Sequence, residues 1–229
     1  MLSVKNIDVA YGHALVLHDI SMELEAGEML FMAGRNGAGK TTFLKSVAGF
    51  MKPVRGSISF FGNDMRDLPP DKVALLGIRY VFQDKRVFSN LTVKENLELA
   101  AYPLKEKVSA AVDKIMSIYP KMEKFLNLRA GSLSGGQRQI LLIGRALVGN
   151  PKLLLIDEPT EGLAAGTIND IMNVLAMMKG KISMIIVEKN LSVVGMLADR
   201  VHIMREGKIV QEFTEKADIT DKTRLEQYV

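Results

Sequence analysis

Residues 34–41 read GRNGAGKT, directly after the apolar run Met29–Ala33 and directly before a stretch with a helical pattern, Lys40–Ala48. The octapeptide matches G-x-x-x-x-G-K-S/T in full. Glycines let the backbone turn its N–H groups around phosphate oxygens, and the following helix offers the positive end of its dipole. The order strand, loop, helix therefore predicts a phosphate site. The alternative is a glycine-rich turn that matches by chance.

The residues predicted to hold the nucleotide phosphates form this loop and the first helical turn: Gly34, Arg35, Asn36, Gly37, Ala38, Gly39, Lys40, Thr41 and Thr42. Lys40 is expected to reach the β- and γ-phosphates, and the Thr41 hydroxyl to ligate Mg²⁺. Thr42 is expected to add a second hydroxyl to the phosphate cradle.

Two carboxylates follow the apolar run Leu153–Ile156, where a buried strand would emerge into a loop. Burying ionised carboxylates without partners costs several kcal/mol, so the pair indicates a metal or a reaction. Asp157 is predicted to hold the Mg²⁺ shell, and Glu158 to polarise the water that attacks the γ-phosphate. Two solvated residues at a strand end are the alternative.

Strands and helices alternate along most of the chain, which favours an α/β layer with a largely parallel sheet. Between about Leu91 and Val148 the pattern is helical instead, and Tyr119-Pro120 is expected to end one helix. This helical block lies between two strands of the alternating pattern. We therefore expect a single domain over 1–229 with a helical subdomain inserted at about 84–148.

Composition narrows the function classes. The 229 residues are 48% hydrophobic and 24% charged and include no cysteine, so a sizeable core is available and a disulfide framework or thiolate metal site is excluded. No apolar run is long enough to cross a bilayer, so any membrane role is expected to act through a partner. The net charge of +4 comes without a dense basic block, so no nucleic-acid partner is expected.

One further motif resembles that of a known protein family. Residues 133–137 read LSGGQ at the start of a predicted helix, which resembles the signature motif of ABC (ATP-binding cassette) ATPases. The hydroxyl and glycine N–H groups at a helix N-terminus also form an anion site, although a serine-capped helix is the alternative. The resemblance implies that two subunits pack head to tail and that each ATP lies between the Lys40 loop of one subunit and the signature of the other. The signature residues are Ser134, Gly135, Gly136 and Gln137.

The resemblance covers essentially the whole chain and implies the ABC ATPase fold. That fold has a P-loop NTPase core with a mostly parallel sheet, an antiparallel β subdomain and an inserted α-helical signature subdomain. The resemblance places Tyr11 against the adenine, with a core tyrosine as the alternative. It also places Gln83 on Mg²⁺ and in the coupling to a membrane partner, with a surface amide as the alternative.

The chain departs from the family pattern at two positions. Lys189 stands where most ABC ATPases have a histidine, and Ala164 stands where an aspartate usually communicates across the dimer. Lys189 is either a donor to the γ-phosphate, as a flexible ammonium, or a solvated lysine at a strand end. We expect slow but real ATP turnover.

The segments Glu161–Ala164 and Val187–Asn190 resemble one importer branch, which includes the smaller ATPase of branched-chain amino-acid importers and of urea importers. Members of that branch often have Pro-Glu-Gly-Arg where residues 82–85 read FQDK, which leaves the solute open. The resemblance implies a cytoplasmic ATPase, peripheral on the inner face of the membrane. Its expected partners are a second ABC ATPase subunit, a permease that docks near Val87–Leu91, and indirectly a solute-binding protein. A soluble ABC ATPase serving cluster assembly and a scaffold that barely hydrolyses ATP are the competing hypotheses.

Overall fold

The structure is a computed structural model that describes residues 1–228, and these residues form two compact units. The first, here the sheet unit, comprises 1–80, 152–158 and 179–228, and the second, here the helical unit, comprises 81–151 and 159–178. The predicted α/β class with parallel and antiparallel sheets is confirmed. The insert boundary at about 84–148 stays a prediction.

A six-stranded sheet runs in the order β10-β9-β3-β8-β7-β6. β3 pairs in parallel with β8 and β9, β7 pairs in parallel with β8, and β9 and β10 form an antiparallel hairpin. Every residue of β3, β7 and β8 is buried, as expected for continuous apolar strands inside a parallel sheet. The strands are β3 (Met29–Ala33), β6 (Ile78–Val81), β7 (Leu153–Asp157), β8 (Ser183–Val187), β9 (Arg200–Arg205) and β10 (Lys208–Phe213).

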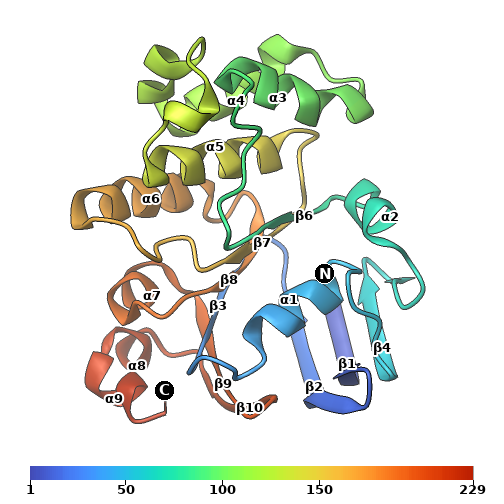
Figure 1. The fold of residues 1–229 in the computed structure, drawn as a ribbon. Helices are drawn as coiled ribbons and strands as arrows, with labels where there is room; N and C mark the ends of the chain where they lie inside the picture. Colours follow the sequence, from blue (N-terminus) through green and yellow to red (C-terminus); the bar gives the residue numbers. More distant parts are fainter. Residues whose placement is uncertain (229) are drawn as a thin grey trace. The chain divides into compact units, whose positions relative to one another are not determined.

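A second, antiparallel sheet has the order β2-β1-β4-β5. Helix α1 (Lys40–Val47) contacts β2 of this sheet and β7 and β8 of the other, so both sheets share one hydrophobic core in which Leu2, Phe43 and Leu155 are buried (Figure 1). The sheet strands are β1 (Leu2–Tyr11), β2 (Ala14–Leu24), β4 (Arg55–Phe60) and β5 (Asn63–Asp64), and helix α2 (Pro70–Leu75) follows them.

Three short helices complete the sheet unit: α7 (Leu191–Leu197), α8 (Lys216–Thr220) and α9 (Lys222–Glu226). They pack on one another, and Figure 1 shows them beside β8 and β9. Among residues 1–228, no helix is long and apolar enough to cross a membrane.

The helical unit is built around α4, which contacts α3, α5 and α6 (Figure 1). Its stripe of buried residues, Ala111, Ile115 and Ile118, has helical spacing. α4 ends at Ile118, so the predicted stop at Tyr119-Pro120 is confirmed. The helices are α3 (Val93–Ala101), η1 (Tyr102–Leu104), α4 (Val108–Ile118), η2 (Pro120–Phe125), η3 (Ala130–Ser132), α5 (Gly135–Leu147) and α6 (Ala165–Met178).

Candidate functional site

The carboxyl ends of β3, β7 and β8 meet at one edge of the parallel sheet, which is where α/β proteins bind ligands. Two backbone hydrogen bonds fix the chain as it leaves this edge. The N–H of Glu158 donates to the carbonyl of Val187 at 2.9 Å, and the N–H of Glu188 donates to the carbonyl of Met32 at 3.2 Å. The phosphate loop, the acidic pair and the segment that contains Lys189 therefore start from adjoining strand ends.

The phosphate loop follows β3 and leads into α1. Gly34 has φ = 140°, and a Cβ there would lie 2.2 Å from the carbonyl oxygen of Met204, so only glycine fits. Lys40 is buried, and its Nζ donates to the carbonyls of Gly34 and Arg35 at 2.5 and 2.9 Å. Burial lowers the pKa of Lys40, against the opposing effect of nearby carboxylates. The ammonium is thus held inside its own loop.

Asp157 joins the loop to β7. Its side chain accepts hydrogen bonds from the Thr41 hydroxyl at 3.2 Å and from the Tyr80 hydroxyl at 3.0 Å. Burial raises the pKa of Asp157, and both hydroxyl donors oppose that shift. A buried carboxylate next to a threonine hydroxyl offers the hard oxygen ligands that Mg²⁺ prefers. Among residues 1–228, no group of three or more His, Cys, Asp or Glu side chains is arranged so that it could hold a metal ion.

Glu158 follows in a left-handed backbone conformation, φ = 47°. That region is unfavourable for a residue with a side chain, and such outliers concentrate at functional sites. The carboxylate is buried and forms an ion pair with Lys189 Nζ at 2.7 Å, while the Lys189 side chain is 36% exposed. The structure therefore brings Lys40, Thr41, Asp157, Glu158 and Lys189 together at one sheet edge.

The segment that carries Lys189 is fixed by the residue before it. Glu188 is buried, and its Oε1 accepts hydrogen bonds from the backbone N–H groups of Lys189 and Asn190 at 2.7 and 2.9 Å. Asn190 in turn caps α7 by accepting from the Ser192 N–H. Neither Glu188 nor Tyr80 was predicted to belong to the site, because only the packing of neighbouring strands shows their partners.

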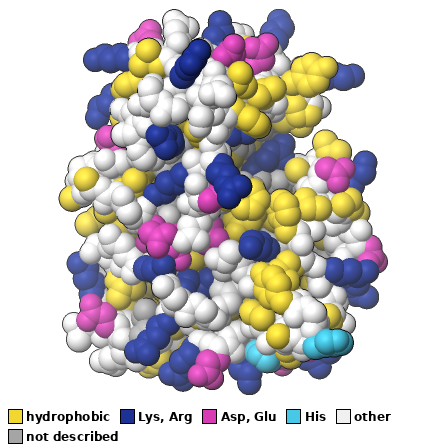
Figure 2. Space-filling model, in the orientation of Figure 1, with side chains coloured by type: hydrophobic (Ala, Val, Ile, Leu, Met, Phe, Trp, Pro, Cys, Tyr) yellow, Lys and Arg dark blue, Asp and Glu magenta, His cyan; other side chains and the backbone are white. Residues whose placement is uncertain are grey.

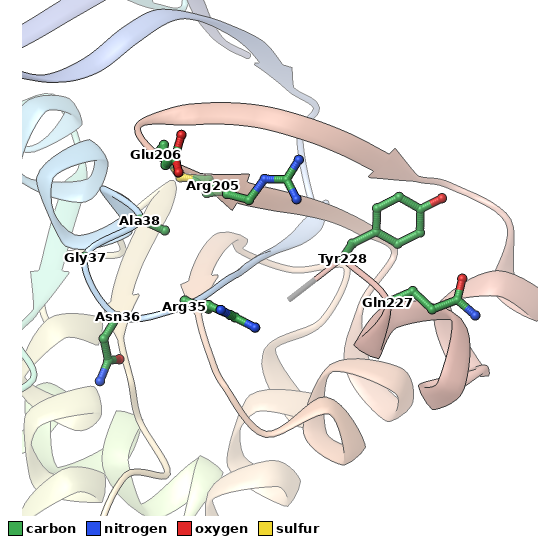
Figure 3. Close-up of a pocket in the computed structure, with 9 residues that line it drawn as sticks. Arg35, Asn36, Gly37, Ala38, Arg205, Glu206, Gln227 and Tyr228 are labelled. Carbon is green, nitrogen blue, oxygen red and sulfur yellow. The ribbon is translucent and has the colours of Figure 1, made fainter.

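A pocket of about 370 Å³ lies beside the phosphate loop. In Figure 3 the side chain of Arg35 extends from the loop toward Tyr228, and Arg205 reaches toward the same ring from β9. The lining is thus mainly polar and carries two guanidinium groups next to the predicted phosphate site. Its residues are Arg35, Asn36, Gly37, Ala38, Met204, Arg205, Glu206, Gln227 and Tyr228.

Two other predicted ligand residues also lie in the sheet unit. Tyr11 ends β1 at the turn to β2 and is half exposed, so its ring is accessible for stacking. Thr42 is buried in the first turn of α1.

Gln83 and the signature residues lie in the helical unit. The Gln83 side-chain amide donates to Glu161 Oε2 at 2.5 Å, and Lys85 Nζ donates to the Glu161 carbonyl. At the start of α5, Ser134 Oγ accepts from the Gln137 N–H at 3.3 Å, and Gln137 Oε1 accepts from the Ser134 N–H at 2.9 Å. This capping box satisfies two end groups of the helix and leaves the turn exposed.

The central glycine of the signature is required by packing. A Cβ on Gly136 would lie 1.8 Å from Cγ2 of Thr167 in α6, whereas one on Gly135 would lie 3.3 Å from Leu163 Cδ2. The first turn of α5 therefore packs so closely against Thr167 of α6 that position 136 has no room for a side chain.

A glycine-rich loop between a parallel strand and a helix, with a buried carboxylate at the end of a neighbouring strand, defines a P-loop nucleotide hydrolase. A family model described as ABC transporter matches residues 17–161. The chain belongs to the ABC transporter family and is an ATPase.

Known relatives agree with this assignment. The chain is 36% identical to the high-affinity branched-chain amino acid transport ATP-binding protein BraG of Pseudomonas aeruginosa, over 100% of this chain and 99% of the relative. It is 32% identical to a probable branched-chain amino acid transport ATP-binding protein, LivF of Archaeoglobus fulgidus, over 91% and 90% of the two chains. A dimeric ATP-binding cassette solved in a post-hydrolysis state with ADP and Pi is 26% identical, with a TM-score of 0.83 over 93% of this chain and 98% of that chain.

Proposed function

We propose that this chain is the ATP-hydrolysing subunit of an importer of amino acids or a similar small polar solute, and that it works at the cytoplasmic face of the membrane on a separate permease. The observation that carries the proposal is the convergence of Lys40, Thr41, Asp157 and Glu158 at one sheet edge. The relatives named for branched-chain amino acid transport support the solute class.

The buried cluster accounts for binding and hydrolysis. Lys40 would exchange its two carbonyl partners for the β- and γ-phosphates, since a phosphate is a stronger acceptor than a carbonyl. Thr41 and Asp157 would hold Mg²⁺, which when bound supplies charge neutralisation at the phosphates. Glu158 would orient the attacking water and accept its proton. Gln83 stays a predicted Mg²⁺ ligand, and Tyr11 a predicted stacking partner of adenine.

A second copy of this chain, or a sister ATPase, would complete the site. The exposed turn at Ser134 offers a hydroxyl and the backbone N–H groups of a helix N-terminus, which suit the phosphates of an ATP bound to the other subunit. The dimeric relative solved with ADP and Pi supports this arrangement. ATP would then favour the closed dimer, because its γ-phosphate gains a second set of donors only there.

A docking surface for the permease is proposed at Val87–Leu91. The buried Asn96 side chain fixes this segment: its Oδ1 accepts from the Phe88 N–H at 3.0 Å, and its amide donates to the Phe88 carbonyl at 3.0 Å. The Phe88 ring is half exposed and lies 5.0 Å from the Arg145 guanidinium. A rigid segment that presents an exposed aromatic ring is suited to a partner helix.

The sheet unit also carries exposed apolar side chains. In the face drawn in Figure 2, hydrophobic residues gather around α2, where Leu75 is exposed. Such a patch is typical of a protein-binding surface and is consistent with a permease partner.

The proposal is tested by measuring phosphate release with Mg-ATP over a range of protein concentrations, for wild type and Glu158→Gln. A rate that rises faster than linearly with protein and falls at least about 100-fold in Glu158→Gln supports a self-assembling dimer with Glu158 at its chemistry. Unchanged turnover in Glu158→Gln would remove Glu158 from the mechanism. Retained permease binding by Phe88→Asp would remove the docking segment.

A further inference from the structure

The ion pair between Lys189 and Glu158 places a cation on the carboxylate that the proposed mechanism assigns to water activation. The two charged atoms are 2.7 Å apart, and the carboxylate side chain is only 7% exposed. The attacking water needs a hydrogen bond to this carboxylate. The ammonium therefore competes with water for Glu158.

The same cation lies within electrostatic range of the phosphate loop. Burial is the main cause of the lowered pKa of Lys40; the charge of Glu158 opposes it, the charge of Lys189 adds to it, and the charge of Asp157 opposes it. Two ammonium groups and two carboxylates thus lie in one partly buried cluster, which consists of Lys40, Lys189, Asp157 and Glu158. Adding the phosphates of a nucleotide brings several negative charges to this cluster, so the cations gain new partners and the carboxylates lose theirs.

The side chain of Lys189 can also move while its backbone stays fixed. Its N–H is held by Glu188, but its charge sits at the end of a flexible four-carbon stem that is 36% exposed. An ammonium has no fixed hydrogen-bond plane, so it can turn from a carboxylate to a nearby phosphate without a change in the loop.

We propose that Lys189 is a positioning residue that exchanges partners: it holds Glu158 before nucleotide binds and transfers to the γ-phosphate of ATP, which leaves Glu158 to orient water. This inference rests on the proposed role of Glu158. It makes the general base available only when a third phosphate is present, so ADP leaves the ion pair intact.

The nucleotide-free ion pair is tested by a double-mutant cycle with Lys189→Met and Glu158→Gln. Alone, Lys189→Met removes one cation from a buried carboxylate, and we expect Tm to fall by about 3–6 °C. In the Glu158→Gln background the same change should lower Tm clearly less, because the carboxylate that pairs with Lys189 is already gone. The exchange is contradicted at this step if Lys189→Met lowers Tm equally in both backgrounds.

The transfer to the γ-phosphate is tested by nucleotide affinity, measured by calorimetry with dilute protein, Mg²⁺ and either ADP or the β,γ-imido analogue of ATP. In the Glu158→Gln background, Lys189→Met should weaken binding of the analogue at least about tenfold. The charged hydrogen bond between Lys189 and the γ-phosphate is lost, and in this background Lys189 has no ion pair with residue 158 that binding would have to break. In the wild-type background, Lys189→Met should weaken binding of the analogue less than about threefold. The variant loses the contact with the γ-phosphate, but the analogue no longer has to break the ion pair between Lys189 and Glu158. ADP affinity should not change.

Equal losses in both backgrounds would show that Lys189 keeps one partner throughout, and equal losses for ADP and the analogue would exclude the γ-phosphate. Lys189→Arg, which keeps the cation, should restore the difference between ADP and the analogue. Lys179→Met is the matched control, since Lys179 also pairs with a carboxylate at 2.7 Å and its side chain is 34% exposed. It should lower Tm equally in both backgrounds and leave nucleotide affinity unchanged.

The outcomes separate the two proposals. If Glu158→Gln keeps full turnover, the role of Glu158 in the proposed function fails, whatever the cycle gives. If turnover is lost but the cycle shows no coupling, only the exchange by Lys189 fails.

Discussion

The phosphate-loop edge of the sheet unit and the signature turn of the helical unit are both predicted to bind phosphate, but they are stabilised in different ways. At the sheet edge, Lys40, Asp157 and Glu158 are buried, and the two carboxylates have partners far away in sequence. At the signature, Ser134 and Gln137 satisfy each other three residues apart and remain near solvent.

This difference predicts how the stability and the function of each site respond to the loss of one side chain. Removing one member of a buried charged cluster leaves another charge without compensation, which affects both stability and chemistry. Removing one member of a capping box costs a local hydrogen bond, and its larger effect is expected only on a ligand or partner. Substitutions at Lys40, His202, Gly136 and Ser134 separate these cases, with expected effects that decrease in that order.

Lys40→Met tests the buried cluster directly. It removes the donor predicted to stabilise charge on the transferring phosphoryl group, so we expect turnover to fall at least about 100-fold and ATP affinity to weaken. Phosphate release and nucleotide calorimetry measure the two effects. Lys208→Met, on an exposed position of β10, should leave both unchanged. Near-normal turnover in Lys40→Met would contradict the assignment of the loop.

His202 tests a buried titratable group of the sheet unit that carries no charge at neutral pH. It is 2% exposed, its Nε2 lies 3.6 Å from Glu212 Oε2, and burial lowers its pKa from 6.5 to about 4, against the opposing charge of Glu212. Because the unfolded chain takes up the proton first, His202 should cost no stability above pH 6.5. It should cost about 3 kcal/mol as the pH falls from 6.5 to 4.

Urea denaturation of wild type and His202→Leu at several pH values checks this loss. The difference in unfolding free energy between the two proteins should be constant above about pH 7 and should shift in favour of His202→Leu below it. A pH-independent difference would show that the imidazole titrates normally in the folded state.

Gly136→Ala tests packing beneath the signature turn. Its Cβ would overlap Thr167 Cγ2, and because threonine is stiff at χ1, α5 and α6 must separate. We expect a loss of about 1–3 kcal/mol in unfolding free energy. Thr167→Ser, which removes that methyl group, should restore part of it. Gly135→Ala is the control with looser surroundings, and a loss as large as that of Gly136→Ala would contradict the packing argument.

Ser134→Ala separates capping from phosphate binding. We expect a stability loss of about 1 kcal/mol, the usual value for an N-cap. Thr92→Ala removes the equivalent capping box of α3 and should cost the same. Only Ser134→Ala should reduce ATP turnover, because only that cap faces a nucleotide in the proposed dimer. Equal turnover in the two variants would reduce the signature to a helix cap.

Patterns of consecutive residues were sufficient for much of the fold. The apolar runs of β3 and β7 predicted buried strands, and Tyr119-Pro120 predicted the end of α4. Strand β2 (Ala14–Leu24) was not among the predicted strands. Its pairing with β1 shifts register at several points, which interrupts the alternation between Leu17 and Ile20, whereas Ile20–Leu24 alternate regularly between buried and exposed.

The sequence by itself determined the phosphate loop, the acidic pair, the signature turn and the family, because each is a short run whose chemistry depends on its immediate neighbours. It left two readings for Lys189, and it gave no sign of Tyr80 or Glu188 as members of the site. Only the order of β3, β8, β7 and β6 in the sheet brings these residues together, so that Tyr80 reaches Asp157 and Lys189 reaches Glu158. Contacts between residues far apart in sequence depend on strand order and register, and a single sequence does not encode these as a local pattern.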